Sequence, residues 1–140
     1  MSAAANKLTF TRFHREVLLG ENYAVIDEIV APDVVSHNPI PGQEPGAEGL
    51  KKALRGFRKA FPDLRSTAED MIAEGDRVAC RFTAQATHLG EFLGHPPTGQ
   101  KFTYEEMVFV RITDGKIVEH WAVADVMDMM LKMGAIQYNR

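Results

Sequence analysis

The sequence predicts an α+β fold in which helices cover one face of a strongly curved, mostly antiparallel sheet. Apolar residues recur at helical spacing in the N-terminal part, as far as Phe61. After Asp63 they alternate instead, in runs joined by the hairpin signals Glu74-Gly75-Asp76 and Asp114-Gly115. Such a sheet would leave a cone that the helices close at its narrow end. The 140 residues fit a single domain, 1–140, with one core.

The first two predicted helices lie at the N-terminus. The first is defined by apolar residues near helical spacing that stop at Gly20, namely Leu8, Phe10, Phe13, Val17 and Leu18. The second is short and runs from Asn22, whose side chain can cap it, to Ile29. Ala31-Pro32 ends this helix, because proline disfavours a helical residue before it.

A short strand and a third helix follow. We predict the strand over 34–37, with Val35 and His37 on one face. Helix-breaking residues from Asn38 to Gly46 then indicate a loop, so His37 stands at a strand-to-loop junction. The third helix has one apolar face, closed by Pro62, that consists of Leu50, Leu54, Phe57 and Phe61.

Four extended runs complete the predicted sheet. The first pair is 66–73 and 77–88, in which Phe82 and His88 share one face with the small residues Ala84 and Ala86. A long loop rich in glycine and proline, 89–99, leads to the second pair, 101–113 and 116–126. A short C-terminal helix, 127–133, ends at Gly134, a typical residue after a helix end.

The turn at Asp114-Gly115 predicts which side chains of the last hairpin face one another. With Thr113 opposite Lys116, one face carries the pairs Ile112–Ile117, Val110–Glu119, Val108–Trp121, Glu106–Val123 and Tyr104–Asp125. We interpret this face as an apolar pocket with an acid at its end. The outer face is expected to carry His120 with Met107, Phe109 and Ala122, and its apolar character predicts packing against a second subunit.

Composition excludes several classes of partner. The net charge is −3 and the basic residues are scattered, so the sequence predicts no basic patch for nucleic acid or an anionic membrane surface. No signal peptide or membrane-spanning run is present, so we expect a cytoplasmic protein. The single cysteine, Cys80, is expected to be a small core residue. No His-Glu-x-x-His or comparable spacing occurs, so we predict no metal site.

Several motifs together resemble those of the SnoaL-like polyketide cyclases, a family of the nuclear transport factor 2 (NTF2)-like superfamily. They are Val34-Val35-Ser36-His37-Asn38-Pro39, Phe61-Pro62-Asp63, Thr87-His88-Leu89-Gly90-Glu91-Phe92-Leu93-Gly94, Pro96-Pro97-Thr98-Gly99, Asp114-Gly115-Lys116-Ile117-Val118-Glu119-His120-Trp121, Asp125 and the ending 131–134. The resemblance spans nearly the whole chain. It implies an NTF2-like cone, a curved, mostly antiparallel sheet wrapped around three N-terminal helices with a short C-terminal helix.

The resemblance further implies an ester cyclase without a cofactor. Such an enzyme closes a ring in a polyketide ester by an intramolecular aldol condensation, with a carboxylate as general acid and base. Asp125 matches that carboxylate, His37 matches a histidine inside the pocket, and Trp121 would form a flat wall for a polycyclic substrate. A homodimer is also implied. The expected ligand is a small apolar or polycyclic metabolite.

Other residues complete the predicted site, and other functions stay open. Tyr104 is a candidate donor to an enolate, Glu106 a second acid, and His88 a residue of the pocket mouth, while Phe82 and Val108 are candidate pocket walls. His14 and His95 carry no supporting pattern. An isomerase with the same base, an epoxide hydrolase with an acid dyad, or a non-catalytic binding protein for a small apolar ligand are the alternatives.

Overall fold

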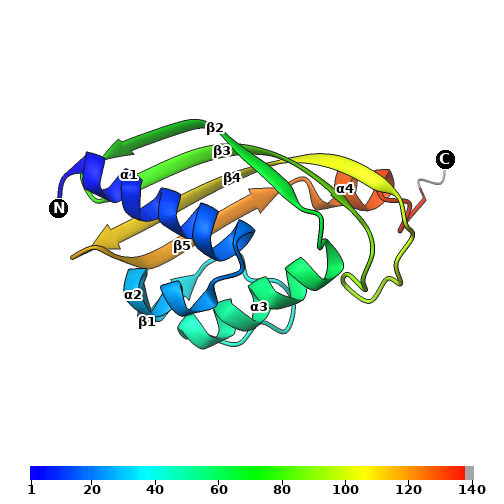
Figure 1. The fold of residues 1–140 in the computed structure, drawn as a ribbon, viewed down its shortest axis with the longest axis horizontal. Coiled ribbons are helices and arrows are strands. Elements are labelled where there is room, and N and C mark those ends of the chain that lie inside the picture. The colour runs from blue at the N-terminus through cyan, green and yellow to red at the C-terminus, as the bar shows by residue number, and fades with distance from the viewer. Residues whose placement is uncertain (138–140) are drawn as a thin grey trace.

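The computed structural model describes residues 1–137 and confirms the α+β class (Figure 1). Five strands form one curved sheet in the order β1-β5-β4-β3-β2, with helices packed along its inner face. The elements are α1 (Ala3–Arg12), η1 (Phe13–Leu19), η2 (Tyr23–Val25), α2 (Ile26–Ile29), β1 (Val30–Ser36), α3 (Gly46–Ala60), β2 (Arg65–Glu74), β3 (Arg77–Thr87), β4 (Lys101–Thr113), β5 (Lys116–Ala124) and α4 (Val126–Lys132).

The first strand is longer than predicted. β1 begins at Val30 rather than at Val34 and contains Pro32. Because β1 is an edge strand that pairs only with β5, in parallel, the missing N–H of proline can face away from the sheet. The first predicted helix also divides, since α1 continues as a π-helical segment, η1, that ends before Gly20.

The last hairpin forms at the predicted turn. Asp114 and Gly115 both have positive φ, 51° and 76°, as a type I′ turn requires. Thr113 pairs with Lys116 and Ile112 with Ile117, as expected. Arg111 then pairs with Glu119, so Val118 is an extra residue in β5. This bulge shifts the register of the rest of the strand by one residue.

The predicted register beyond the bulge is therefore wrong. Instead of the predicted partners, Val110 pairs with His120, Val108 with Ala122 and Glu106 with Ala124. A shift of one residue moves every later side chain of β5 to the other face of the sheet, because side chains alternate with period two. His120, Ala122 and Ala124 thus face the helices, and Trp121 and Val123 share the outer face with Phe109 and Met107.

The core consists of two hydrophobic clusters along the inner face. The first packs α1, η1, α2 and α3 against β3, β4 and β5, and it contains Cys80, buried as expected. The second packs the end of α3, loop 89–99 and α4 against β3 and β4. Gly90 holds this loop on α3, where a Cβ would lie 2.5 Å from the Lys59 carbonyl oxygen. Within residues 1–137, no helix combines the length and the apolar character needed to cross a membrane.

Candidate functional site

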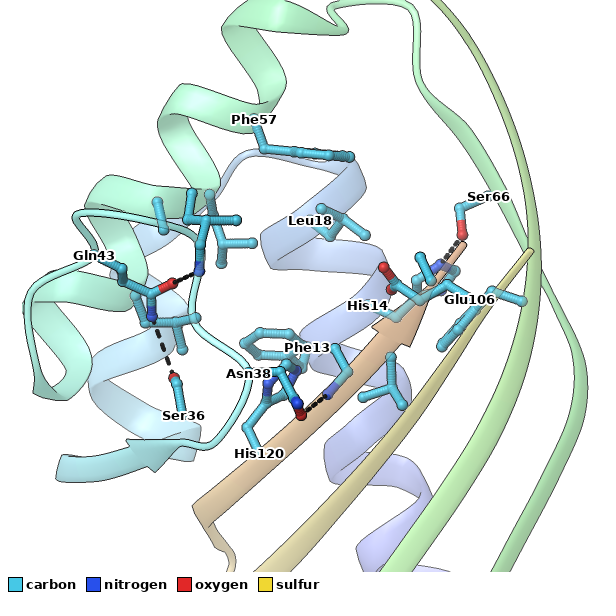
Figure 2. Close-up of a pocket in the computed structure, with 18 of the residues that line it drawn as sticks. Phe13, His14, Leu18, Ser36, Asn38, Gln43, Phe57, Ser66, Glu106 and His120 are labelled. Carbon is cyan, nitrogen blue, oxygen red and sulfur yellow. Dashed lines mark hydrogen bonds between the residues drawn. The ribbon is translucent and has the colours of Figure 1, made fainter. Parts of the chain in front are cut away.

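A cavity of about 230 Å³ lies between the two hydrophobic clusters (Figure 2). Its walls are mostly apolar and include five phenylalanines from five segments, Phe10, Phe13, Phe57, Phe82 and Phe92. Asn38, Ile40 and Val126 are exposed members of its lining, so they mark where it opens. No lysine or arginine within the described residues 1–137 lines it. A largely apolar hollow with a few polar groups is typical of a small-molecule site.

Among residues 1–137, Glu106 is the only carboxylate that lines the cavity. It projects from β4 on the inner face of the sheet, toward η1 (Figure 2). Burial raises its pKa from 4.5 to about 7, because the ionised carboxylate is desolvated there. A carboxyl group that titrates near neutrality can both accept and return a proton under physiological conditions.

His120 reaches the cavity from β5 because of the bulge at Val118. Its ring lies 6.2 Å from the Phe13 ring, centroid to centroid. Burial lowers its pKa to about 4, so the imidazole is neutral at neutral pH and carries one N–H donor. Next to it, the Asn38 side-chain oxygen accepts a hydrogen bond of 3.1 Å from the Ala122 backbone N–H and so anchors the loop after β1.

A second buried histidine lies over the sheet near Glu106. The His14 ring packs against the Phe82 ring at 4.5 Å, and Phe82 is the cross-strand partner of Glu106. The His14 Nε2 atom is 2.9 Å from the Ser66 Oγ atom, within hydrogen-bond distance. Burial lowers the pKa of His14 to about 4 as well. The cavity therefore holds one titratable carboxyl group and two neutral imidazoles (Figure 2).

The structure brings four of the predicted site residues into the cavity lining. They are Phe82, Tyr104, Glu106 and Val108, all on the inner face of β3 or β4. Burial, and secondarily the nearby Glu106, raise the pKa of the Tyr104 hydroxyl, which keeps it protonated. The chemical roles of these side chains stay predictions.

Trp121 and His37 do not line the cavity, contrary to prediction. The bulge turns Trp121 to the outer face, where its ring stacks on the His37 ring at 4.3 Å. Ser36 is the last inward-facing residue of β1, so the next residue, His37, points outward. His37 Nε2 lies 2.8 Å from Glu119 Oε2, and Arg111 donates to the other oxygen of Glu119 at 2.6 Å.

Asp125 and His88 are also not among the residues that line the cavity, although Ala124 and Val126, on either side of Asp125, line it. Asp125 is exposed, and its Oδ1 accepts a hydrogen bond of 2.9 Å from the Asp128 N–H, so it caps the N-terminus of α4. His88 is fully buried in the region of the second cluster, 6.0 Å from the Phe61 ring. Its Nδ1 accepts a hydrogen bond from the Thr98 N–H, which ties loop 89–99 to the sheet.

Sequence reasoning missed six polar residues of the cavity lining, which are His14, Ser36, Asn38, Gln43, Ser66 and His120. A signal for His14 was present, because Phe10, His14 and Leu18 are spaced by four and all three line the cavity. The alternation of side chains along the strand predicted His120 on the outer face, which is wrong because the bulge at Val118 shifts the register of β5. No comparable signal existed for Ser66. Within residues 1–137, no group of three His, Cys, Asp or Glu side chains is arranged to hold a metal ion.

Comparisons with known proteins agree with the fold. The sequence model of the SnoaL-like polyketide cyclase family matches residues 9–133 of this chain. Aklanonic acid methyl ester cyclase DauD from Streptomyces sp. (strain C5) is 28% identical over 111 residues, which cover 79% of this chain and 67% of that protein. The nogalonic acid methyl ester cyclase of Streptomyces nogalater is 27% identical over 111 residues, 78% and 83% of the two chains. The solved structure of AclR from Streptomyces galilaeus, described as a candidate hydroxylase, superposes with a TM-score of 0.82 at 33% identity and covers 97% and 100% of the two chains.

Proposed function

The chain belongs to the SnoaL-like polyketide cyclase family, and on that premise we propose that it closes a ring in a polyketide ester by an intramolecular aldol-type condensation, without a cofactor. The observation that carries the proposal is Glu106, whose carboxyl group lines an apolar cavity and has a pKa near 7. The named methyl ester cyclases among the relatives support the ester as substrate class. Glu106 takes the acid/base role that the sequence had suggested for Asp125.

The reaction needs one group that moves a proton twice. Ionised Glu106 removes a proton from a carbon next to two carbonyl groups, and the resulting enolate carbon forms a bond to a second carbonyl carbon of the same molecule. The oxygen of that carbonyl becomes an alkoxide, which takes the proton back from Glu106. Substrate and product are isomers, and the enzyme returns to its starting state.

His120 is the proposed donor to the oxygen that becomes negative. A neutral imidazole N–H stabilises an enolate by a hydrogen bond that is strong in an apolar, water-poor cavity. The low pKa of His120, caused by burial, keeps the ring in this neutral form across the working pH range. The aromatic walls, Phe13 and Phe82 among them, would hold the rings of the substrate.

The pH dependence of kcat/KM follows from the Glu106 pKa. Only ionised Glu106 can accept a proton, so the rate is expected to rise with pH and to level off above about 7. The two buried histidines, with pKa values of about 4, add no inflection between pH 5.5 and 9 by this argument. A rate that falls over the interval from pH 6 to 8 would contradict Glu106 as the base.

A mass-resolved assay tests the proposed reaction. The purified protein is incubated with a panel of polyketide methyl esters, and products are separated by chromatography coupled to mass spectrometry. A cyclase or an isomerase yields a product of unchanged mass, and NMR then distinguishes a new carbon–carbon bond from a moved double bond. Epoxide opening adds one water and hydroxylation adds one oxygen atom. Ligand binding with no product would favour the alternative, a non-catalytic binding protein.

We also propose a homodimer that forms through the outer face of the sheet. Its apolar side chains Met107, Phe109 and Val123 are 62%, 38% and 64% exposed, an arrangement that monomeric proteins rarely leave open to water. The His37–Trp121 stack lies on the same face and extends this apolar area.

Charge placed on this face is expected to separate the subunits. In Val123→Glu, two carboxylates would be buried in a symmetric apolar interface, which is costly. Sedimentation velocity should show a dimer for the wild type and a monomer for Val123→Glu. The matched control is Leu8→Glu, which changes a similarly exposed apolar residue on α1, away from the outer face, and should stay dimeric. A monomeric wild type at micromolar concentration would contradict the proposal.

A further inference from the structure

The cavity is small for a ligand site. Its volume of about 230 Å³ lies below the roughly 300–1,000 Å³ that is common for pockets holding drug-sized molecules. The part of a substrate that it encloses is therefore limited to one or two fused rings. A larger substrate would have to extend past Ile40 and Val126, the exposed lining residues, into solvent.

Phe57 forms the wall of the cavity toward the second cluster. It projects from α3, lines the cavity and packs against that cluster. Figure 2 shows its ring lying across one end of the cavity, above Leu18. Behind it, the ring of Phe61 contacts it edge-on at a centroid distance of 4.9 Å. The ring of Phe92, which also lines the cavity, contacts it edge-on at 6.0 Å.

This wall is held from behind by buried groups. Phe61 is fully buried at the C-terminal end of α3, and Arg58 donates a hydrogen bond of 2.8 Å to its carbonyl oxygen. Phe92 is held by the loop that Gly90 docks on α3 through hydrogen bonds from Leu89 N–H and Gly90 N–H to the Ala60 carbonyl. Displacement of close-packed aromatic rings of this kind costs packing energy. The Phe57 ring therefore limits how far a ligand can extend at this end of the cavity.

We propose that Phe57 determines substrate specificity by restricting the enclosed portion of the ester substrate to one or two fused rings. The proposal rests on the proposed function, since it concerns the substrate of the same cavity. It adds a size class that neither the family nor the acid/base chemistry specifies. Removing the Phe57 ring would lengthen the cavity toward Phe61 and admit a third ring.

Binding of unreactive esters tests this limit separately from catalysis. Methyl benzoate, methyl 2-naphthoate and methyl anthracene-2-carboxylate carry one, two and three rings and have no acidic carbon, so turnover plays no part. Titration calorimetry should show that wild-type affinity rises about tenfold from one ring to two, because the second ring is buried, and less than about threefold, or not at all, from two to three. Phe57→Ala should restore a further gain of about tenfold for the third ring.

Two further variants keep the test interpretable. Phe57→Leu removes less volume, so it serves if Phe57→Ala folds poorly, with a smaller gain expected. Tyr23→Ala is the matched control. The Tyr23 ring packs under Arg55, which lies on α3 as Phe57 does, but Tyr23 does not line the cavity. It should keep the wild-type pattern.

Each outcome has a defined meaning. A wild-type affinity that keeps rising by about tenfold at the third ring, or an unchanged pattern in both Phe57 variants, would overturn the size limit while the cyclase proposal stands. If the wild-type affinity levels off at two rings but the mass-resolved assay shows no product, the size limit stands and the cyclase proposal is overturned. Failure of all three esters to bind would overturn the size limit, and the mass-resolved assay would then decide the cyclase proposal by itself.

Discussion

Glu106→Gln is expected to lower kcat/KM for the ester substrate by about 10²–10⁴-fold, the usual contribution of a general acid/base. Glutamine has nearly the same shape but cannot accept the proton from carbon. Since the amide keeps the cavity filled, ligand affinity should change by less than about threefold. Steady-state kinetics with the ester, and calorimetry with an unreactive analogue, measure the two effects separately.

Two comparison variants sharpen this result. Glu105→Gln changes the neighbouring carboxylate, which is exposed and lies outside the cavity lining, and should leave the rate unchanged. Asp125→Asn changes the residue that the sequence pattern suggested and that caps α4. If Asp125→Asn abolishes turnover and Glu106→Gln does not, the assignment of the base to Glu106 is wrong.

Stability should move in the opposite direction to activity in Glu106→Gln. Burial raises the folded-state pKa of Glu106 to about 7, so the folded protein holds a proton there that the unfolded chain releases near pH 4.5. The wild type therefore loses stability as pH rises from about 4.5 to 7, and glutamine does not. The variant should be more stable at pH 8, by about 1–3 kcal/mol in the free energy of unfolding, and nearly equal at pH 4. Urea denaturation at the two pH values measures this difference.

His120→Phe is expected to reduce kcat by about 10²–10³-fold, the cost of removing one oxyanion donor. Phenylalanine preserves the aromatic contact with Phe13 but has no N–H to donate. KM should change little, because the hydrogen bond strengthens only as negative charge develops. His120→Gln, which keeps a donor, should recover part of the rate. The kcat and KM values of the three proteins, with folding checked by circular dichroism, measure the effect.

The pH profile distinguishes a donor from a base at position 120. His120→Phe should keep the inflection near pH 7, because that inflection belongs to Glu106. Loss of the inflection in His120→Phe, with a full rate for Glu106→Gln, would instead identify His120 as the proton acceptor.

Much of the fold could be read from local patterns. The tight turn at Asp114-Gly115, a strand on either side of it and the apolar face of α3 all appear in the structure as predicted. These features depend on interactions between residues close in sequence, such as the positive φ that a type I′ turn needs. For the same reason, the inward orientation of Tyr104, Glu106 and Val108 followed from parity along one regular strand.

Only the tertiary structure decided which residues complete the site. The extra residue at Val118 reversed the parity of β5 and exchanged Trp121 for His120 in the cavity. Nothing in the alternation of β5 marks this bulge, because its position depends on pairing with both neighbouring strands, β1 and β4. His14 and Ser66 meet across 52 residues of sequence, through the packing of η1 on the sheet. The sequence by itself determined the family, the elements and the inward-facing carboxylate Glu106. Long-range pairing and packing, which local periodicity does not encode, determined which imidazoles lie beside it.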